Sequence, residues 1–149
     1  MKFMMFMIPK VYQPGTPADE QAGEGFAPPA EAVKAMMKYN EELAEAGALI
    51  SLDGLHPLAN GAHVSFKGEK PTVIDGPFIE TKEVIGGYWV IDVNSKDEAI
   101  EWARKCPANK GDVIEIRQIF GEEDFPEDVG DAADNPAVKE AIERGKAKQ

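Results

Sequence analysis

The chain has 149 residues, of which 43% are hydrophobic and 29% are charged, and its formal net charge at pH 7 is −11. The length predicts one globular domain, and the negative charge argues against nucleic acid or an anionic membrane as a partner, because both attract basic surfaces. The single cysteine, Cys106, excludes an internal disulfide and a cysteine-rich metal site, so we expect a cytoplasmic protein.

The first predicted strand covers residues 3–8, which are apolar at every position. A strand with one solvated face would alternate, so we expect this sheet to be covered on both faces. The run is shorter than the ~18 residues of a membrane span and lacks an A-x-A cleavage site, which favours a strand over a signal peptide.

Residues 9–29 are rich in Pro and Gly and predict a long loop, which is either a lid or partner contact or a plain excursion.

An amphipathic helix is predicted from Pro29 to Gly47, the glycine that ends it. Its expected buried stripe has the helical spacing i, i+3, i+4, i+7. The stripe consists of Val33, Met36, Met37, Asn40, Leu43 and Ala44. Asn40 is the one polar member. A buried amide needs hydrogen-bond partners, so Asn40 either ties the helix to a neighbouring backbone or lines a polar pocket.

Residues 48–53 predict a second strand, in which side chains alternate between the two faces. One face receives Ile50 and Leu52, and the other receives Leu49, Ser51 and Asp53. A Gly-Leu-His-Pro turn follows and contains His56. Residues 62–67 and 71–75 then predict a short hairpin that ends at Asp75, whose carboxylate either caps its own turn or faces a cleft.

The second half of the domain predicts a strand over residues 88–93, a helix that begins at the capping box of Ser95 and stops at Pro107, and a strand over residues 113–120. Ile114, Ile116 and Phe120 are expected on one face of the last strand, with Glu115 and Arg117 on the other. The order strand, helix, strand, hairpin, strand, helix, strand predicts an α+β, ferredoxin-like fold with both helices on one face of the sheet.

An acidic tail follows the predicted domain, which we assign to residues 1–121. Within the tail, residues 122–149, Pro136 begins a run with helical spacing. A helix this short is marginal by itself, so it is either a frayed, solvated end or docks on a partner subunit.

The run DGPFIETKEVIGGYWVIDV, residues 75–93, resembles the signature of the DGPF group of YCII-related proteins, small members of the dimeric α+β barrel superfamily. The likeness covers roughly residues 2–120. It implies a homodimer in which two sheets face each other as a barrel with a cleft, and most members have no assigned reaction. The sequence also favours a homodimer, because Phe3, Met5 and Met7 would otherwise leave one sheet face apolar and exposed.

Four polar side chains are expected on the sheet face opposite the helices. They are Ser51, Asp53, Glu115 and Arg117. Charged groups do not line a dry core. We expect Ser51, Glu115 and Arg117 to bind a substrate, with Arg117 on the carboxylate or enolate of a small organic acid. His56 is the candidate proton acceptor, and Asp75 or Asp53 is the candidate carboxylate that orients it.

A structural interpretation of the same residues remains open, in which His56 is a turn residue, Asp75 caps its turn and Glu115 pairs with Arg117. Other YCII-related proteins resemble lyases or isomerases with a His-Asp pair, but the helix-side motif that carries their histidine is not found in this sequence.

Three functions follow from these alternatives: a lyase or isomerase acting in the dimer cleft, a non-catalytic small-molecule-binding or regulatory module, and a structural interaction protein built around the acidic tail. No HxH, HExxH, CxxC or phosphate-binding glycine motif occurs, so we expect no metal and no cofactor.

Overall fold

A computed structural model of the chain describes residues 1–23, 25–76, 83–126, 129–130 and 134–147. Residues Met1–Ile119 form one compact unit, and Phe120–Gln149 form a second. None of the described helices is long and apolar enough to span a membrane.

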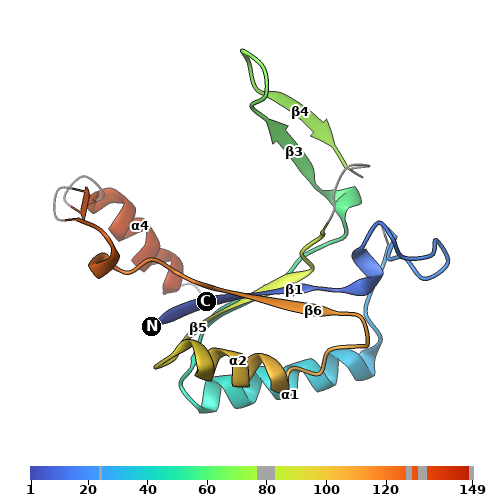
Figure 1. Ribbon diagram of the computed structural model, residues 1–149, viewed down its shortest axis with the longest axis horizontal. Helices are drawn as coiled ribbons and strands as arrows, with labels where there is room; N and C mark the ends of the chain where they lie inside the picture. Colours follow the sequence, from blue (N-terminus) through green and yellow to red (C-terminus); the bar gives the residue numbers. More distant parts are fainter. Residues whose placement is uncertain (24, 77–82, 127–128, 131–133, 148–149) are drawn as a thin grey trace. The chain divides into compact units, whose positions relative to one another are not determined.

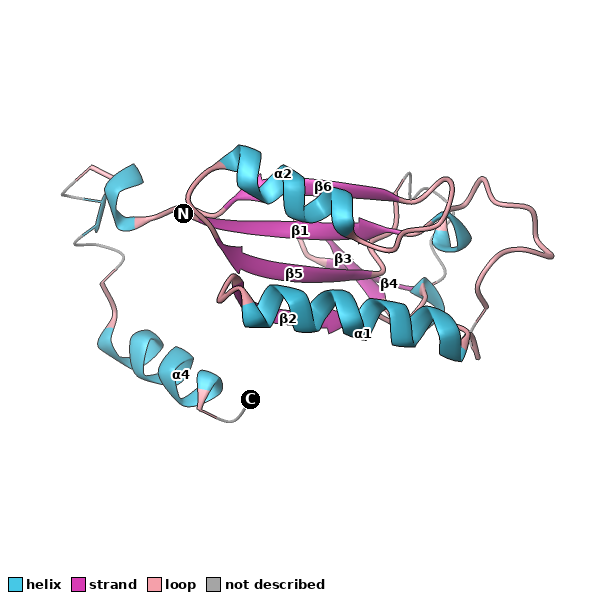
Figure 2. Cartoon of the chain, turned by 90° about the horizontal axis from the view of Figure 1, so that it is seen from below, coloured by secondary structure: helices cyan, strands magenta, loops and turns pink. Residues whose placement is uncertain are grey.

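The first unit is built on a four-stranded antiparallel sheet with the strand order β2-β5-β1-β6. These strands are β1 (Lys2–Ile8), β2 (Leu49–Gly54), β5 (Gly87–Asp92) and β6 (Val113–Gln118). The helices α1 (Ala30–Glu45) and α2 (Lys96–Lys105) lie side by side on one face of the sheet (Figures 1 and 2). The α+β, ferredoxin-like fold predicted from the sequence is therefore confirmed.

The core lies between the sheet and the two helices. It contains Phe3, Met5, Met7, Tyr39, Leu43, Trp89, Ile91, Val93 and Ala99. Phe3, Met5 and Met7 therefore face the helices, and the expectation that they leave a sheet face exposed is wrong. Because both the odd- and the even-numbered positions of residues 3–8 are apolar, alternation alone could not decide which three side chains point toward α1 and α2.

Two polar contacts hold α1 in place within this core. The buried Trp89 indole donates a hydrogen bond of 2.8 Å to Oδ1 of Asn40. Asn40 therefore links the helix to a neighbouring strand as expected, but its partner is a side chain and not the backbone. The Tyr39 hydroxyl donates to the carbonyl of Trp102 at 3.0 Å and links α1 to α2. Burial raises the pKa of Tyr39 above its usual value, so the hydroxyl remains a donor.

The predicted stripe of α1 is only half correct. Leu43 and Asn40 are buried and Met36 is partly buried, whereas Val33, Met37 and Ala44 are exposed. Tyr39 takes the remaining buried position. The core face of α1 is therefore rotated toward α2, because a helix beside a second helix buries the side chains that point to both the sheet and its neighbour.

A β-bulge in β2 changes the predicted alternation. Leu49 pairs with Ile91, but Ser51 already pairs with Val90, so Ile50 is an extra residue on this strand. As a result Leu49 and Leu52 both pack against the core, and Ile50 is exposed. The predicted faces of Leu49 and Ile50 are thus exchanged, because a bulge interrupts the period of two.

The ends of the elements follow recognisable capping chemistry. The hydroxyl of Ser95 accepts a hydrogen bond from the Glu98 amide, but the Glu98 carboxylate accepts from Asn94 and not from Ser95, so the predicted capping box is only half formed. Gly47 ends α1 at a φ of 69°, a left-handed conformation that favours glycine. β6 ends at Gln118, so Phe120 does not belong to it as expected.

The hairpin of β3 (Ala62–Ser65) and β4 (Thr72–Asp75) forms its own two-stranded sheet.

In the second unit, α4 (Pro136–Lys146) begins where the Asn-Pro pair predicts, with the Asn135 side chain accepting hydrogen bonds from the amides of Ala137 and Val138. No described side chain of α4 is buried.

Candidate functional site

The candidate site is the sheet face opposite α1 and α2, here called the open face. Residues paired directly across neighbouring strands share a face, so the pairing register identifies its members. Met4 and Phe6 of β1 and Tyr88 and Val90 of β5 form its centre, and all four are partly exposed. Ser51, Asp53, Glu115 and Arg117 flank them on the two edge strands.

Two rows of side chains cross the open face. The first row runs Asp53, Tyr88, Phe6, Glu115, and the second runs Ser51, Val90, Met4, Arg117. Each row is therefore polar at both edges and apolar or aromatic in the middle. The predicted placement of the four polar residues opposite the helices is correct, whereas their roles in binding stay predictions.

Asp53 and Tyr88 form the closest polar pair of the open face. The Tyr88 hydroxyl donates a hydrogen bond of 2.8 Å to Oδ2 of Asp53. This hydrogen bond is the main cause that raises the pKa of Tyr88 above its usual value, with smaller contributions from desolvation and from the Asp53 charge. Tyr88 consequently stays neutral at physiological pH and keeps its proton for donation.

Arg117 and Glu115 form a looser pair on the opposite edge strand. They are two residues apart on the same side of β6, and their Nε and Oε1 atoms are 4.0 Å apart. The Arg117 side chain is largely exposed and that of Glu115 about half exposed, so this ion pair contributes little to stability, and at this distance it does not use all the guanidinium donors.

His56 was predicted to be the proton acceptor, oriented by either Asp75 or Asp53. His56 is exposed in the turn after β2, and among the described side chains none hydrogen-bonds to it. Asp75 ends β4, but its side chain is outside the described part of the chain. Asp53 is paired with Tyr88 and not with His56. The pairing of His56 with Asp75 stays a prediction.

The backbone around Gly76 explains part of the DGPF signature. The Gly76 amide donates to the carbonyl of Gly61 at 2.9 Å, and a Cβ added at Gly76 would lie 1.9 Å from the carbonyl oxygen of Leu58. A glycine is therefore required for the end of β4 to approach the turn after β2. Pro77 and Phe78, the other half of the signature, are outside the described residues.

Sequence reasoning missed the centre of the open face. Tyr88, Met4 and Phe6 were treated as ordinary strand residues, although Tyr88 is the partner of Asp53. The period of two gave a usable signal for Tyr88, since Trp89 and Ile91 are the hydrophobic core-forming residues of β5 and Tyr88 alternates with them. No comparable signal existed for Met4 and Phe6 because residues 3–8 are apolar throughout.

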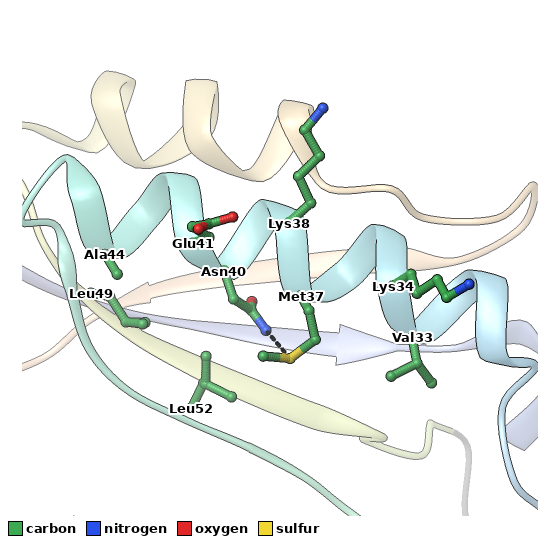
Figure 3. Close-up of a pocket in the computed structure, with 9 residues that line it drawn as sticks. All are labelled: Val33, Lys34, Met37, Lys38, Asn40, Glu41, Ala44, Leu49 and Leu52. Carbon is green, nitrogen blue, oxygen red and sulfur yellow. Dashed lines mark hydrogen bonds between the residues drawn. The ribbon is translucent and has the colours of Figure 1, made fainter.

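A groove with a volume of about 680 Å³ lies elsewhere, between α1 and β2 (Figure 3). Val33, Met37, Leu49 and Leu52 extend toward it, whereas Lys38 points away from it. It accounts for the exposed half of the predicted α1 stripe. None of the predicted site residues lines this groove.

The described residues contain no cluster of three or more His, Cys, Asp or Glu side chains that could hold a metal ion. The side chains of the open face present a carboxylate hydrogen-bonded to a phenol, a guanidinium, a hydroxyl and an apolar centre.

Comparison with known proteins identifies a family that this chain matches. A family model described as the YCII-related domain matches residues 1–123. An uncharacterized protein of Rhizobium meliloti (strain 1021) is 42% identical over 60 residues, which are 40% of this chain and 48% of that protein. The chain thus spans about half the length of this curated relative.

Proposed function

Because the chain belongs to the YCII-related family, we propose that it works as a cytoplasmic homodimer that encloses a small organic acid between two facing sheets and, as a lyase or isomerase, moves a proton on it. The observation that carries this proposal is the Asp53–Tyr88 hydrogen bond on the same sheet face as the guanidinium of Arg117.

Dimerisation is supported by the centre of the open face. Met4, Phe6 and Val90 form an apolar strip that α1 and α2 do not cover, with polar residues at both edges. A second copy placed face to face buries this strip against itself, and a twofold interface is the commonest way for a protein to cover such a patch. The polar edges then become the walls of the enclosed space.

Substrate binding is assigned to Arg117. A planar guanidinium recognises a carboxylate through two parallel hydrogen bonds, and these bonds strengthen when water is excluded. Glu115, at 4.0 Å, orients the guanidinium without using all of its donors. Ser51 lies at the opposite end of this cross-strand row, on the other edge strand, so in this proposal the Ser51 hydroxyl of the facing subunit reaches the uncharged end of the ligand.

Asp53 and Arg117 lie on opposite edge strands, three strand spacings or roughly 14 Å apart. Proton transfer on a ligand held by Arg117 of one subunit is therefore assigned to Asp53 and Tyr88 of the facing subunit. The carboxylate of Asp53 takes a proton from the carbon next to the substrate carbonyl, and the electron pair of that C–H bond moves into an enolate. The Tyr88 hydroxyl, which is protonated at neutral pH as tyrosine ordinarily is, turns from Asp53 to the enolate oxygen and donates a hydrogen bond to it. Return of the proton at a neighbouring atom completes an isomerisation, and loss of a leaving group completes an elimination.

The proposal is tested by proton exchange, which needs no knowledge of the natural substrate. Pyruvate and levulinate are incubated with the protein in D₂O, and loss of the C–H signal next to the carbonyl is followed by NMR. Wild-type protein accelerates exchange, and Asp53→Asn lowers the rate by about 10²- to 10⁴-fold, the usual contribution of a positioned base. Arg117→Gln raises KM more than it lowers kcat.

His56→Ala is the control for the assignment of the base, since in this proposal it exchanges at the wild-type rate. Loss of exchange in His56→Ala with full exchange in Asp53→Asn returns the role of base to His56. Saturable binding of either acid without any exchange rejects catalysis and leaves the non-catalytic binding module as the function.

A further inference from the structure

A second hollow, here called the loop pocket, lies between the long loop of residues 9–29 and the turn that follows β2. Its volume is about 260 Å³. Tyr12, Pro14 and Ala22 line it from the loop, and Pro57, Leu58 and Ala59 line it from the turn. None of the residues assigned to substrate binding or proton transfer on the open face lines this pocket.

The loop that forms one wall is held by specific polar contacts. The side-chain amide of Gln13 accepts a hydrogen bond of 2.9 Å from the Val84 amide and donates one of 3.0 Å to the Val84 carbonyl, much as a neighbouring strand would. Val84 is buried. At the start of the loop, the Lys10 amide donates to Asp112 at 2.8 Å. The shape of this wall is therefore built into the fold.

Tyr12 joins the two walls. Its hydroxyl donates a hydrogen bond of 3.0 Å to the carbonyl of Leu55, next to the turn. The edge-on ring of Phe26 supports the tyrosine ring, with centroids 5.9 Å apart and an angle of 83° between the rings. Gly86 leaves room for the ring, since an added Cβ there would lie 3.2 Å from Cε2 of Tyr12.

The lining of the loop pocket favours an uncharged ligand. Its side chains are apolar except for Tyr12 and Gln21, and none of them carries a charge. The Gln21 amide nitrogen already donates to the Gln13 carbonyl. Burial raises the pKa of the Tyr12 phenol, so this group is neutral and its oxygen can accept one further hydrogen bond. An anion would find no compensating cation in this wall.

The volume limits the ligand to roughly one ring. An apolar cavity of about 150 Å³ holds benzene, and drug-sized ligands occupy about 300 to 1,000 Å³. We propose that the loop pocket binds a small uncharged aromatic compound with one hydrogen-bond donor, of the kind represented by phenol and indole. The ring packs against Tyr12, Pro57 and Leu58, and the donor reaches the oxygen of Tyr12.

The test is an NMR titration of the ¹⁵N-labelled full chain with phenol, indole and benzoate. Phenol and indole give saturable shifts that centre on the amides of Tyr12, Leu58 and Ala59. Benzoate, which matches phenol in its ring but carries a charge, binds at least about tenfold more weakly because its carboxylate loses water without gaining a cation. Unsaturable shifts, shifts centred elsewhere or equal affinity for benzoate and phenol overturn the proposal.

Ala59→Trp fills the pocket from its exposed rim and lowers phenol affinity at least about tenfold. Ala35→Trp adds the same side chain to an exposed position of α1 and leaves affinity unchanged. Dispersed amide spectra establish that each variant is folded, and Ala22→Leu provides a second obstruction if Ala59→Trp is not. Equal affinities in the folded obstructed and control variants reject the site. Asp53→Asn keeps full phenol binding, so this result is independent of the proposed reaction.

Discussion

The Asn40–Trp89 hydrogen bond is the single polar contact on which the packing of α1 against the sheet depends most. It joins a helix to the central strand β5 inside the core, at 2.8 Å. Replacing Asn40 by Leu keeps the approximate volume but leaves the buried indole N–H without its acceptor, which costs about 1–3 kcal/mol. Urea unfolding followed by tryptophan fluorescence measures this loss of stability.

The control for this prediction is a double-mutant cycle with Trp89→Phe. In that background the indole N–H is already absent, so Asn40→Leu costs about 1 kcal/mol less than it does in the wild type. Strict additivity of the two substitutions would show that the hydrogen bond contributes nothing beyond packing.

Gly76 provides a second prediction for a single residue. An alanine there would place its Cβ 1.9 Å from the Leu58 carbonyl oxygen, so one backbone segment must move, at a cost of about 1–3 kcal/mol. Gly68 is a matched control within the same hairpin, because its Cβ would lie 3.9 Å from the nearest atom, the Lys70 carbonyl oxygen. Thermal unfolding should show a Tm below that of the wild type for Gly76→Ala and a Tm close to that of the wild type for Gly68→Ala. Equal Tm values would contradict the close approach.

Two hydrogen bonds between the Gln13 side chain and the Val84 backbone, here called the Gln13 clamp, fix the long loop to the segment before β5. The Val84 amide donates to the Gln13 side chain, so Gln13→Ala exposes that amide to solvent. We predict that hydrogen exchange of Val84 accelerates at least about fivefold, which corresponds to a net hydrogen bond of about 1 kcal/mol. Gln118→Ala, at an exposed position, is the control. Unchanged protection of Val84 in Gln13→Ala would mean that the loop does not depend on the clamp.

Sequence patterns predicted the elements better than the faces they present. The strand and helix order followed from local periodicity and from punctuation by Gly and Pro, and it was sufficient for the fold. The face of β2 was partly wrong because Ile50 is bulged, and strict alternation assumes that no bulge interrupts the strand. The face of α1 was partly wrong because its neighbour α2, distant in sequence, selects Tyr39 over Met37 for burial.

The candidate site was predictable only in part for a similar reason. Alternation placed Asp53, Glu115 and Arg117 on the correct side of the sheet, since polar residues occupy alternate positions in their strands. It could not predict that Tyr88 pairs with Asp53, because that contact depends on the order of strands in the sheet and their register. The Gln13 clamp is equally non-local, with its partners 71 residues apart.

The proposed enclosed site requires a second copy of the chain. The centre of the open face carries the apolar side chains of Met4, Phe6 and Val90, and a charge placed there should prevent the proposed association. Phe6→Asp introduces such a charge on the face opposite α1 and α2. Phe66→Asp adds the same charge at an exposed aromatic residue beyond β3 and serves as the control. Circular dichroism spectra that match the wild type establish that both variants are folded.

Sedimentation equilibrium over a wide concentration range is the most direct measurement of this claim. We predict that the wild type and Phe66→Asp sediment with twice the chain mass of 16.2 kDa, and that Phe6→Asp sediments with the mass of a single chain. A wild-type mass of 16.2 kDa at every concentration, or a folded Phe6→Asp variant that remains a dimer, would contradict the enclosed site between two open faces.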